Sequence, residues 1–71
     1  MMNLQEVERV ATSLIRKYDW NAKEVGTGVR LTVNDGEKYA GVTITTGENI
    51  EEEIKRAIEA VDNHEYGELE G

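Results

Sequence analysis

The chain has 71 residues with 15 acidic and 8 basic side chains, and its net charge is −7. A chain of this length buries only roughly 60% of its unfolded surface, near the lower limit for folding without cross-links. It has no cysteine, which excludes disulfides and cysteine-based zinc sites. It also has no apolar run long enough for a signal peptide or a membrane span, so we expect a cytoplasmic protein.

The excess negative charge is concentrated in the last third of the chain. Residues 1–47 carry six acidic and six basic side chains, whereas residues 48–71 carry nine acidic side chains against Lys55 and Arg56. Direct nucleic-acid binding needs a basic surface that releases counterions from phosphates, so this distribution argues against it. The distribution favours a partner protein with a basic groove.

Residues 4–18 are predicted to form the first helix. Asn3 followed by Glu6 has the form of a capping box. Apolar side chains then recur at helical spacing, at Leu4, Val7, Val10, Ala11, Leu14, Ile15 and Tyr18. Residues 19–21 are expected to leave this helix as a turn, with Trp20 at the edge of the core.

The stretch from Val29 to Thr45 reads as a β-hairpin closed by Asp35-Gly36. A type I′ turn needs positive φ at both central residues, and Asp-Gly between apolar alternations is a strong signal for it. This turn would place Asn34 opposite Glu37, Val33 opposite Lys38, Leu31 opposite Ala40, Val29 opposite Val42 and Thr27 opposite Ile44. One face then collects Val29, Leu31, Val33, Ala40, Val42 and Ile44, and the other collects Arg30, Thr32, Asn34, Tyr39, Thr43 and Thr45.

The remaining elements complete an α+β fold. Ala22–Val25 could add a strand that turns back through Gly26-Thr27-Gly28. A second helix should begin near Thr45 or Asn49, each of which is followed by a glutamate three residues later. Its predicted buried stripe is Ile50, Ile54, Ala57, Ile58 and Val61, and its predicted ion pairs join Glu51 to Lys55 and Glu52 to Arg56.

We therefore predict a helix, a two- or three-stranded antiparallel β-meander and a helix, with both helices on one face of the sheet. Residues 1–71 would form a single domain whose acidic tail could fray from about residue 65.

No catalytic or metal-binding constellation is predicted. Ser13 lies within the first helix, His64 is the only histidine, and no cysteine is present, so no triad or thiol nucleophile can be assembled. Consecutive acids at Glu51, Glu52 and Glu53 point about 100° apart on a helix and cannot converge on one ion. We expect a protein that is not an enzyme and that needs no cofactor.

Four features, taken in order, resemble the small acidic anti-CRISPR proteins of phages and prophages. They are a Met-Asn-Leu start to the first helix, the pair Asp19-Trp20, the hairpin from Val33 to Tyr39, and Asn63-His64-Glu65-Tyr66 followed by further acids. Members of that family inhibit the guide-RNA-loaded effector nuclease of type II-A systems by mimicking DNA. The best-known members continue through a further helix after the second one, and their acidic cluster is denser.

The resemblance implies a binding site made from the hairpin turn and the C-terminal acidic segment. These parts would occupy the nuclease groove that reads the short DNA motif called the PAM. The residues implied are Asn34, Asp35, Gly36, Glu37 and Tyr39 at the hairpin, Glu65, Tyr66, Glu68 and Glu70 in the acidic segment, and Asp19 and Trp20 in support.

The chemistry of such a site is coherent, because a PAM groove is lined with Arg and Lys and carboxylates accept bidentate Arg bonds. We therefore expect a DNA-mimic inhibitor that is a monomer or a homodimer. Two alternatives remain open. One is a small dimeric interaction module that uses its polar sheet face, and the other is a DNA mimic directed at another DNA-binding enzyme.

Overall fold

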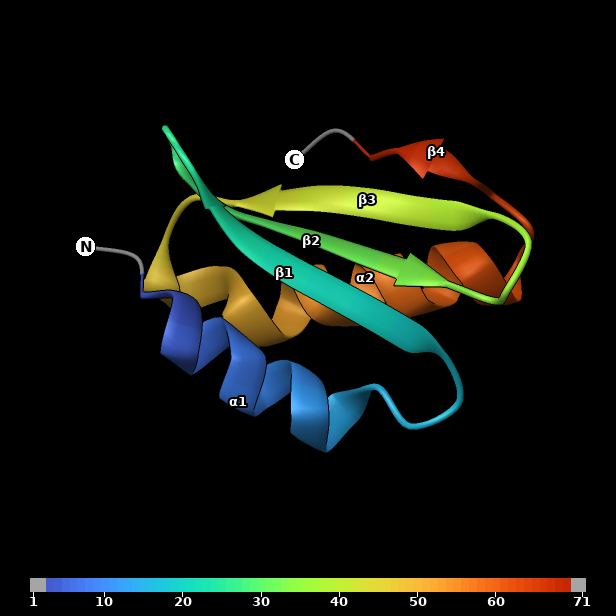
Figure 1. Ribbon diagram of the computed structural model, residues 1–71, viewed down its shortest axis with the longest axis horizontal. Helices are drawn as coiled ribbons and strands as arrows, with labels where there is room; N and C mark the ends of the chain where they lie inside the picture. The colour runs from blue at the N-terminus through green and yellow to red at the C-terminus, as the bar shows by residue number, and fades with distance from the viewer. Residues whose placement is uncertain (1–2, 70–71) are drawn as a thin grey trace.

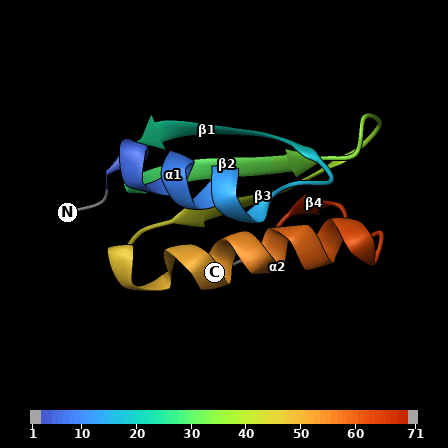
Figure 2. The ribbon, with the colours of Figure 1, turned by 90° about the horizontal axis from the view of Figure 1, so that it is seen from below.

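The computed structural model describes residues 3–69 as two helices and one four-stranded sheet (Figure 1). The elements in chain order are α1 (Leu4–Leu14), β1 (Asp19–Val25), β2 (Gly28–Asn34), β3 (Tyr39–Ile44), a 3₁₀ turn η1 (Gly47–Asn49), α2 (Ile50–Asp62) and β4 (Gly67–Glu68). The sheet order is β1-β2-β3-β4, with β1 to β3 antiparallel and β4 parallel to β3. Both helices lie on the same side of the sheet, α1 near β1 and α2 near β3 (Figure 2). The predicted α+β arrangement is confirmed, and β4 is an addition to it.

The core lies between the sheet and the two helices. The predicted apolar face of the hairpin is buried at every position, and the helices contribute Val7, Ala11, Ile50, Ile54, Ala57, Ala60 and Val61. Burial alternates along β2, as expected for a strand with one covered face. The predicted stripe of α2 is confirmed, except that Ile58 is only half-buried and Ala60 joins the core. None of the helices within residues 3–69 is long and apolar enough to cross a membrane.

Helix α1 is shorter than predicted. Asn3 caps it as expected, because its side-chain oxygen accepts a hydrogen bond from Gln5 N–H at 2.8 Å. The helix ends at Leu14, and Ile15 is already extended, with φ −93° and ψ 100°. The apolar spacing continues to Tyr18, but the chain needs those residues to reach the sheet. Ile15 therefore enters the core from outside the helix.

Strand β1 is confirmed and is longer than Ala22–Val25. All seven of its residues pair with β2, from Asp19 opposite Asn34 to Val25 opposite Gly28. Residues 19–21 are therefore strand and not the predicted turn. Trp20 is half-buried against the core, as predicted for an edge position.

The register between β2 and β3 is shifted by two residues from the prediction. Asn34 pairs with Tyr39, Val33 with Ala40, Leu31 with Val42 and Val29 with Ile44. Asp35 N–H donates to the Lys38 carbonyl at 3.1 Å, so Gly36 and Glu37 are the central residues of the turn. Only Gly36 has positive φ, at 99°, whereas the predicted type I′ turn would need two such residues. The shift is even, so each side chain keeps its predicted face.

Helix α2 has Asn49 as its N-cap, one of the two predicted positions, and the 3₁₀ turn η1 precedes it. The side chain of Thr46 accepts a hydrogen bond from Glu48 N–H at 3.3 Å, while Asn49 at the helix N-cap makes no side-chain capping bond. The predicted ion pair between Glu51 and Lys55 is confirmed at 3.1 Å. A further ion pair joins Arg56 Nη1 and Glu53 Oε1 at 2.8 Å.

The close approach of β2 to β3 at Gly28 gives a stability prediction. A Cβ at Gly28 would overlap the backbone oxygen of Ile44, whereas nothing lies within 4 Å of a Cβ at Gly26. We expect Gly28→Ala to lower the free energy of unfolding by about 1–3 kcal/mol, because the strand backbone must move apart. Gly26→Ala is the matched control and should cost no stability. Urea unfolding measures both, and equal stabilities for the two variants would contradict the close approach.

Candidate functional site

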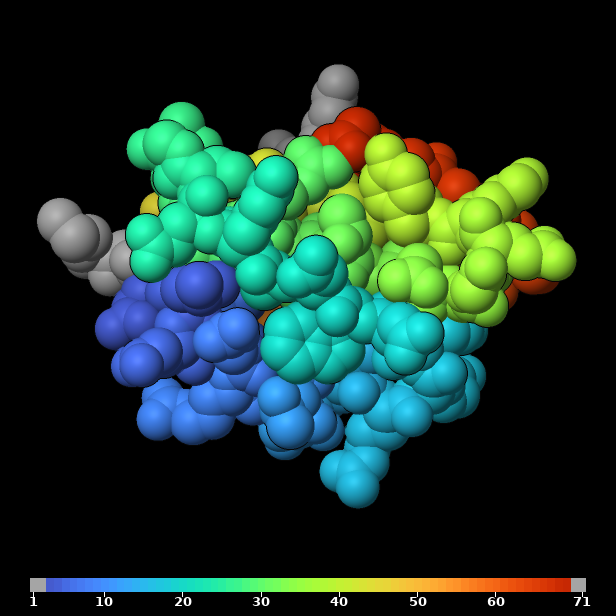
Figure 3. Space-filling view, in the orientation of Figure 1, coloured from blue at the N-terminus to red at the C-terminus, as the bar shows by residue number. Residues whose placement is uncertain are grey.

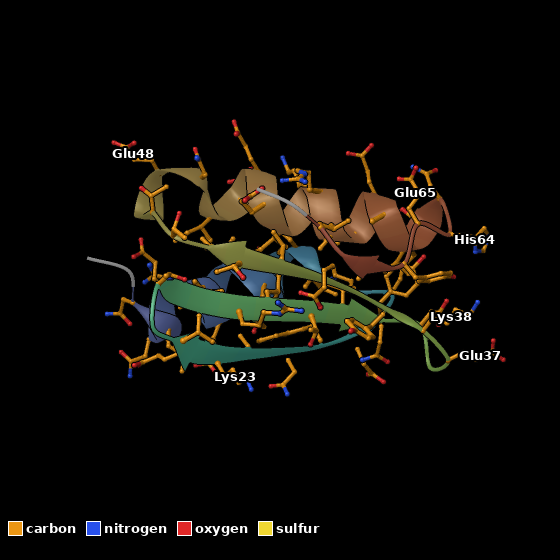
Figure 4. The ribbon with its side chains drawn as sticks, turned by 90° about the horizontal axis from the view of Figure 1, so that it is seen from above. Lys23, Glu37, Lys38, Glu48, His64 and Glu65 are labelled. Carbon is orange, nitrogen blue, oxygen red and sulfur yellow. The ribbon has the colours of Figure 1, made fainter. Side chains whose placement is uncertain are left out.

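The hairpin turn and the segment after α2 meet at one end of the molecule. Figure 4 shows Glu37, Lys38, His64 and Glu65 at this end, whereas Glu48 lies at the opposite end of α2. Strand β1 also starts here, because its first residue is paired with the last residue of β2. We term this region the acidic end and define it by Asp19, Asp35, Glu37, Asp62 and Glu65.

Asp35 stabilises the turn from within. Its Oδ1 accepts hydrogen bonds from the N–H groups of Glu37 and Lys38, both at 3.0 Å. Its Oδ2 accepts a hydrogen bond from the Tyr66 hydroxyl at 2.8 Å. The backbone N–H groups of Lys38 and Glu37, together with Tyr66, lower the pKa of Asp35 to about 2. The carboxylate is therefore ionised at neutral pH, with its oxygens turned toward the protein's own donors.

The chain reverses after α2 through a Schellman motif. His64 N–H donates to the Val61 carbonyl at 3.1 Å, and Glu65 N–H donates to the Ala60 carbonyl at 2.7 Å. His64 has φ 60°, in the left-handed position that glycine usually takes in this motif. The reversal directs Tyr66 back to the sheet, where its ring is half-buried against the core.

Tyr66 is surrounded by polar partners. The His64 Nδ1 atom lies 2.9 Å from the Tyr66 hydroxyl oxygen. Lys38 Nζ lies 5.4 Å from the centre of the Tyr66 ring, which is a cation–π geometry. The hydrogen bond to Asp35 raises the pKa of Tyr66. Tyr66 thus contacts both the turn and its own segment.

The segment that we expected could fray forms β4 instead. Gly67 pairs with Ala40 and Glu68 with Gly41, and Leu69 N–H donates to the Gly41 carbonyl at 2.7 Å. The Glu68 carboxylate binds the Arg30 guanidinium across β3. A Cβ at Gly41 would collide with that guanidinium, so glycine leaves the space that Arg30 needs.

The negative charge of Glu68 is therefore balanced within the fold by Arg30. Its carboxylate also accepts a hydrogen bond from the Tyr39 hydroxyl at 3.3 Å. The hydrogen bond from Arg30 lowers the pKa of Glu68. Glu70, the other acid expected in this segment, lies outside the described residues.

The acids of the acidic end divide into two groups. Asp62 is held by Lys17 Nζ at 3.3 Å and by the Tyr18 hydroxyl, and that hydroxyl bond raises the pKa of Tyr18 to about 12. Within residues 3–69, the exposed side chains of Asp19, Glu37 and Glu65 make neither a hydrogen bond nor an ion pair. These three carboxylates are available to an outside partner.

The structure brings together most of the predicted site. The hairpin residues Asn34, Asp35, Gly36 and Glu37, the C-terminal residues Glu65 and Tyr66, and Asp19 all lie at the acidic end. Tyr39 and Glu68 lie on the open sheet face and bond to each other. Trp20 instead packs on the core side of the sheet.

Sequence reasoning missed Lys38 and His64 as members of this region. A cation beside an acidic turn was a visible signal for Lys38. For His64, the signal was that no glycine follows the apolar stripe of α2 directly, so another residue has to take the left-handed position that ends the helix.

The open face of the sheet holds a shallow groove, whose side chains can be followed across β1 to β3 in Figure 3. The side chains of Val25 and Tyr39, both exposed, contribute to its lining. The charged side chains that line the groove are Lys23, Arg30, Glu37 and Lys38, and Arg30 is ion-paired with Glu68.

The described part of the chain has no group of three or more His, Asp or Glu side chains placed to hold a metal ion. The sequence matches no protein-family model and no curated protein, and the fold matches no solved structure. The resemblance to anti-CRISPR proteins therefore stays a prediction.

The pKa of Asp35 predicts how stability depends on pH. Its folded pKa of about 2 lies below the ordinary value of 3.8. The unfolded state therefore binds more protons between these values, and the stabilisation from Asp35 is complete above about pH 5 and disappears as pH falls toward about 2. We expect the gap in melting temperature between the parent and Asp35→Asn to close over this range.

A direct check is an NMR titration of the Asp35 carboxyl carbon, which should have its midpoint near pH 2. A midpoint near pH 4 for Asp35 would show that the turn does not hold its carboxylate.

Proposed function

We propose that this protein is a DNA-mimic inhibitor that occupies the basic groove of a DNA-binding enzyme. The most specific form of the proposal is the PAM-reading groove of a guide-RNA-loaded type II CRISPR nuclease in the bacterial cytoplasm. The observation that carries it is the gathering of three unpaired carboxylates, Asp19, Glu37 and Glu65, at one end of the molecule. The choice of nuclease rests on the sequence resemblance.

Local structure does not explain why three unpaired acids lie at one end of the molecule. Glu51, Glu52 and Glu53 lie in the first turn of α2, where carboxylates complement the helix dipole. Asp19, Glu37 and Glu65 have no such role, since they lie at a strand start, in a turn and beyond the C-terminal end of α2. A partner with a basic groove would supply the missing charge.

The geometry also suits the donors of a DNA-reading groove. Such grooves present Arg and Lys to phosphates and guanine edges, and a carboxylate accepts the same bidentate Arg contacts. The three carboxylates come from β1, the hairpin turn and the segment after α2, so they form a surface and not a linear run. A folded surface of this kind binds with less ordering cost than a flexible acidic tail.

A DNA cleavage assay with purified, guide-loaded type II-A nuclease tests the proposal. We expect the parent to inhibit cleavage, and the inhibition to weaken with added salt because exposed ion pairs are screened. Neutralising the three unpaired acids together, as Asp19→Asn/Glu37→Gln/Glu65→Gln, should raise the inhibitory concentration by at least about tenfold, which corresponds to 1.4 kcal/mol.

The matched control is Glu24→Gln/Glu48→Gln/Glu52→Gln, which changes net charge equally away from the acidic end. It should inhibit nearly as well as the parent. If both triple variants lose inhibition equally, net charge and not the acidic end is responsible. If the parent inhibits no such nuclease and sediments as a dimer, the interaction module is the better account.

A further inference from the structure

We infer that Tyr66 is the positioning residue of the acidic end. It fixes the hairpin turn to the C-terminal segment, so that Asp35 acts inside the molecule and Asp19, Glu37 and Glu65 are left to meet a basic partner. The identity of that partner rests on the proposed function, whereas the positioning of the turn does not. The inference also differs from the sequence resemblance, which places Asp35 among the contact residues.

The first support is how the oxygens of Asp35 are used. Three donors already occupy this carboxylate, namely two backbone N–H groups of the turn and the Tyr66 hydroxyl. A bidentate Arg from a partner would have to displace Tyr66 or open the turn. Glu37 next to it has an exposed carboxylate with no hydrogen-bonded or ion-paired partner among residues 3–69.

The second support is how few contacts fix the turn. Residues 35–38 are all exposed, so no buried side chain anchors them. Within the described chain, two direct side-chain contacts tie the turn to another segment, the Asp35 hydrogen bond and the Lys38 cation–π contact. Both end on Tyr66, so the orientation of Glu37 relative to Glu65 depends on this side chain.

The third support is that Tyr66 itself is anchored. Its ring packs against the core, and β4 follows it directly along the chain. The pairing of β4 with β3 and the Arg30–Glu68 ion pair hold that strand to the sheet. Tyr66 therefore connects a fixed segment to a turn that is otherwise held by hydrogen bonds within the hairpin.

The test is Tyr66→Phe, which keeps the ring and removes only the hydroxyl. Backbone ¹⁵N relaxation of the free protein measures the order parameters of Gly36 and Glu37. We expect them to fall below about 0.85, the value typical of rigid backbone, because the hydroxyl bond to Asp35 is lost while the ring contact and the bonds within the turn remain. Tyr39→Phe is the matched control, because it removes the hydroxyl that bonds Glu68 on the open face and should leave the turn rigid. A turn as rigid in Tyr66→Phe as in the parent would overturn the inference.

The cleavage assay separates positioning from contact. Tyr66→Phe and Asp35→Asn should each weaken inhibition about threefold to thirtyfold, and Tyr66→Phe should keep the salt dependence because no charge is lost. Glu37→Gln should flatten the salt dependence, since one ion pair with the partner is removed. If Asp35→Asn flattens it equally, Asp35 is a contact residue and the inference fails. Full inhibition by a Tyr66→Phe variant with a mobile turn would also contradict it.

The relaxation measurements and the cleavage assay distinguish the positioning role of Tyr66 from the proposed function. If the parent inhibits no nuclease, the proposed function fails, and the relaxation measurements still decide whether Tyr66 positions the turn.

Discussion

One covered sheet face determines where the charges of this protein lie. Val29, Leu31, Val33, Ala40, Val42 and Ile44 are all buried, and the two helices are both needed to cover them. The other sheet face is left open. Because α2 runs the length of the sheet, its C-terminal end comes to the same end of the molecule as the hairpin turn and the start of β1. The acids that follow these elements are gathered there as a consequence of packing the core.

Gathering acids at one end has a cost, since like charges repel. The fold offsets part of it by internal pairing, with Asp62 held by Lys17 and Tyr18, and with Asp35 held by the turn and Tyr66. Glu68 is paired with Arg30 and ties β4 to the sheet. The carboxylates that remain unpaired at the acidic end are those of Asp19, Glu37 and Glu65.

The faces of the strands could be predicted because alternation is a local pattern. The register could not, since Asp35 bonds the following backbone N–H groups and Tyr66, and so the turn is centred one residue later than Asp35-Gly36 suggests. Strand β4 was missed because its pairing is short, parallel and dependent on Arg30 crossing Gly41. For the candidate site, the acids were visible in the sequence. Their division into internal and unpaired groups depends on contacts between segments far apart in the chain.

The central claim is that the acidic end and target DNA occupy the same groove of a nuclease. Equilibrium competition tests it most directly, with labelled protein bound to guide-loaded, cleavage-inactive type II-A nuclease and titrated with duplex that carries the PAM. The account predicts mutually exclusive binding, so the apparent Kd of the protein should rise in proportion to the concentration of PAM duplex, and duplex without the PAM should have little effect. A ternary complex, in which nuclease holds the protein and the PAM duplex together at undiminished affinity, would contradict it.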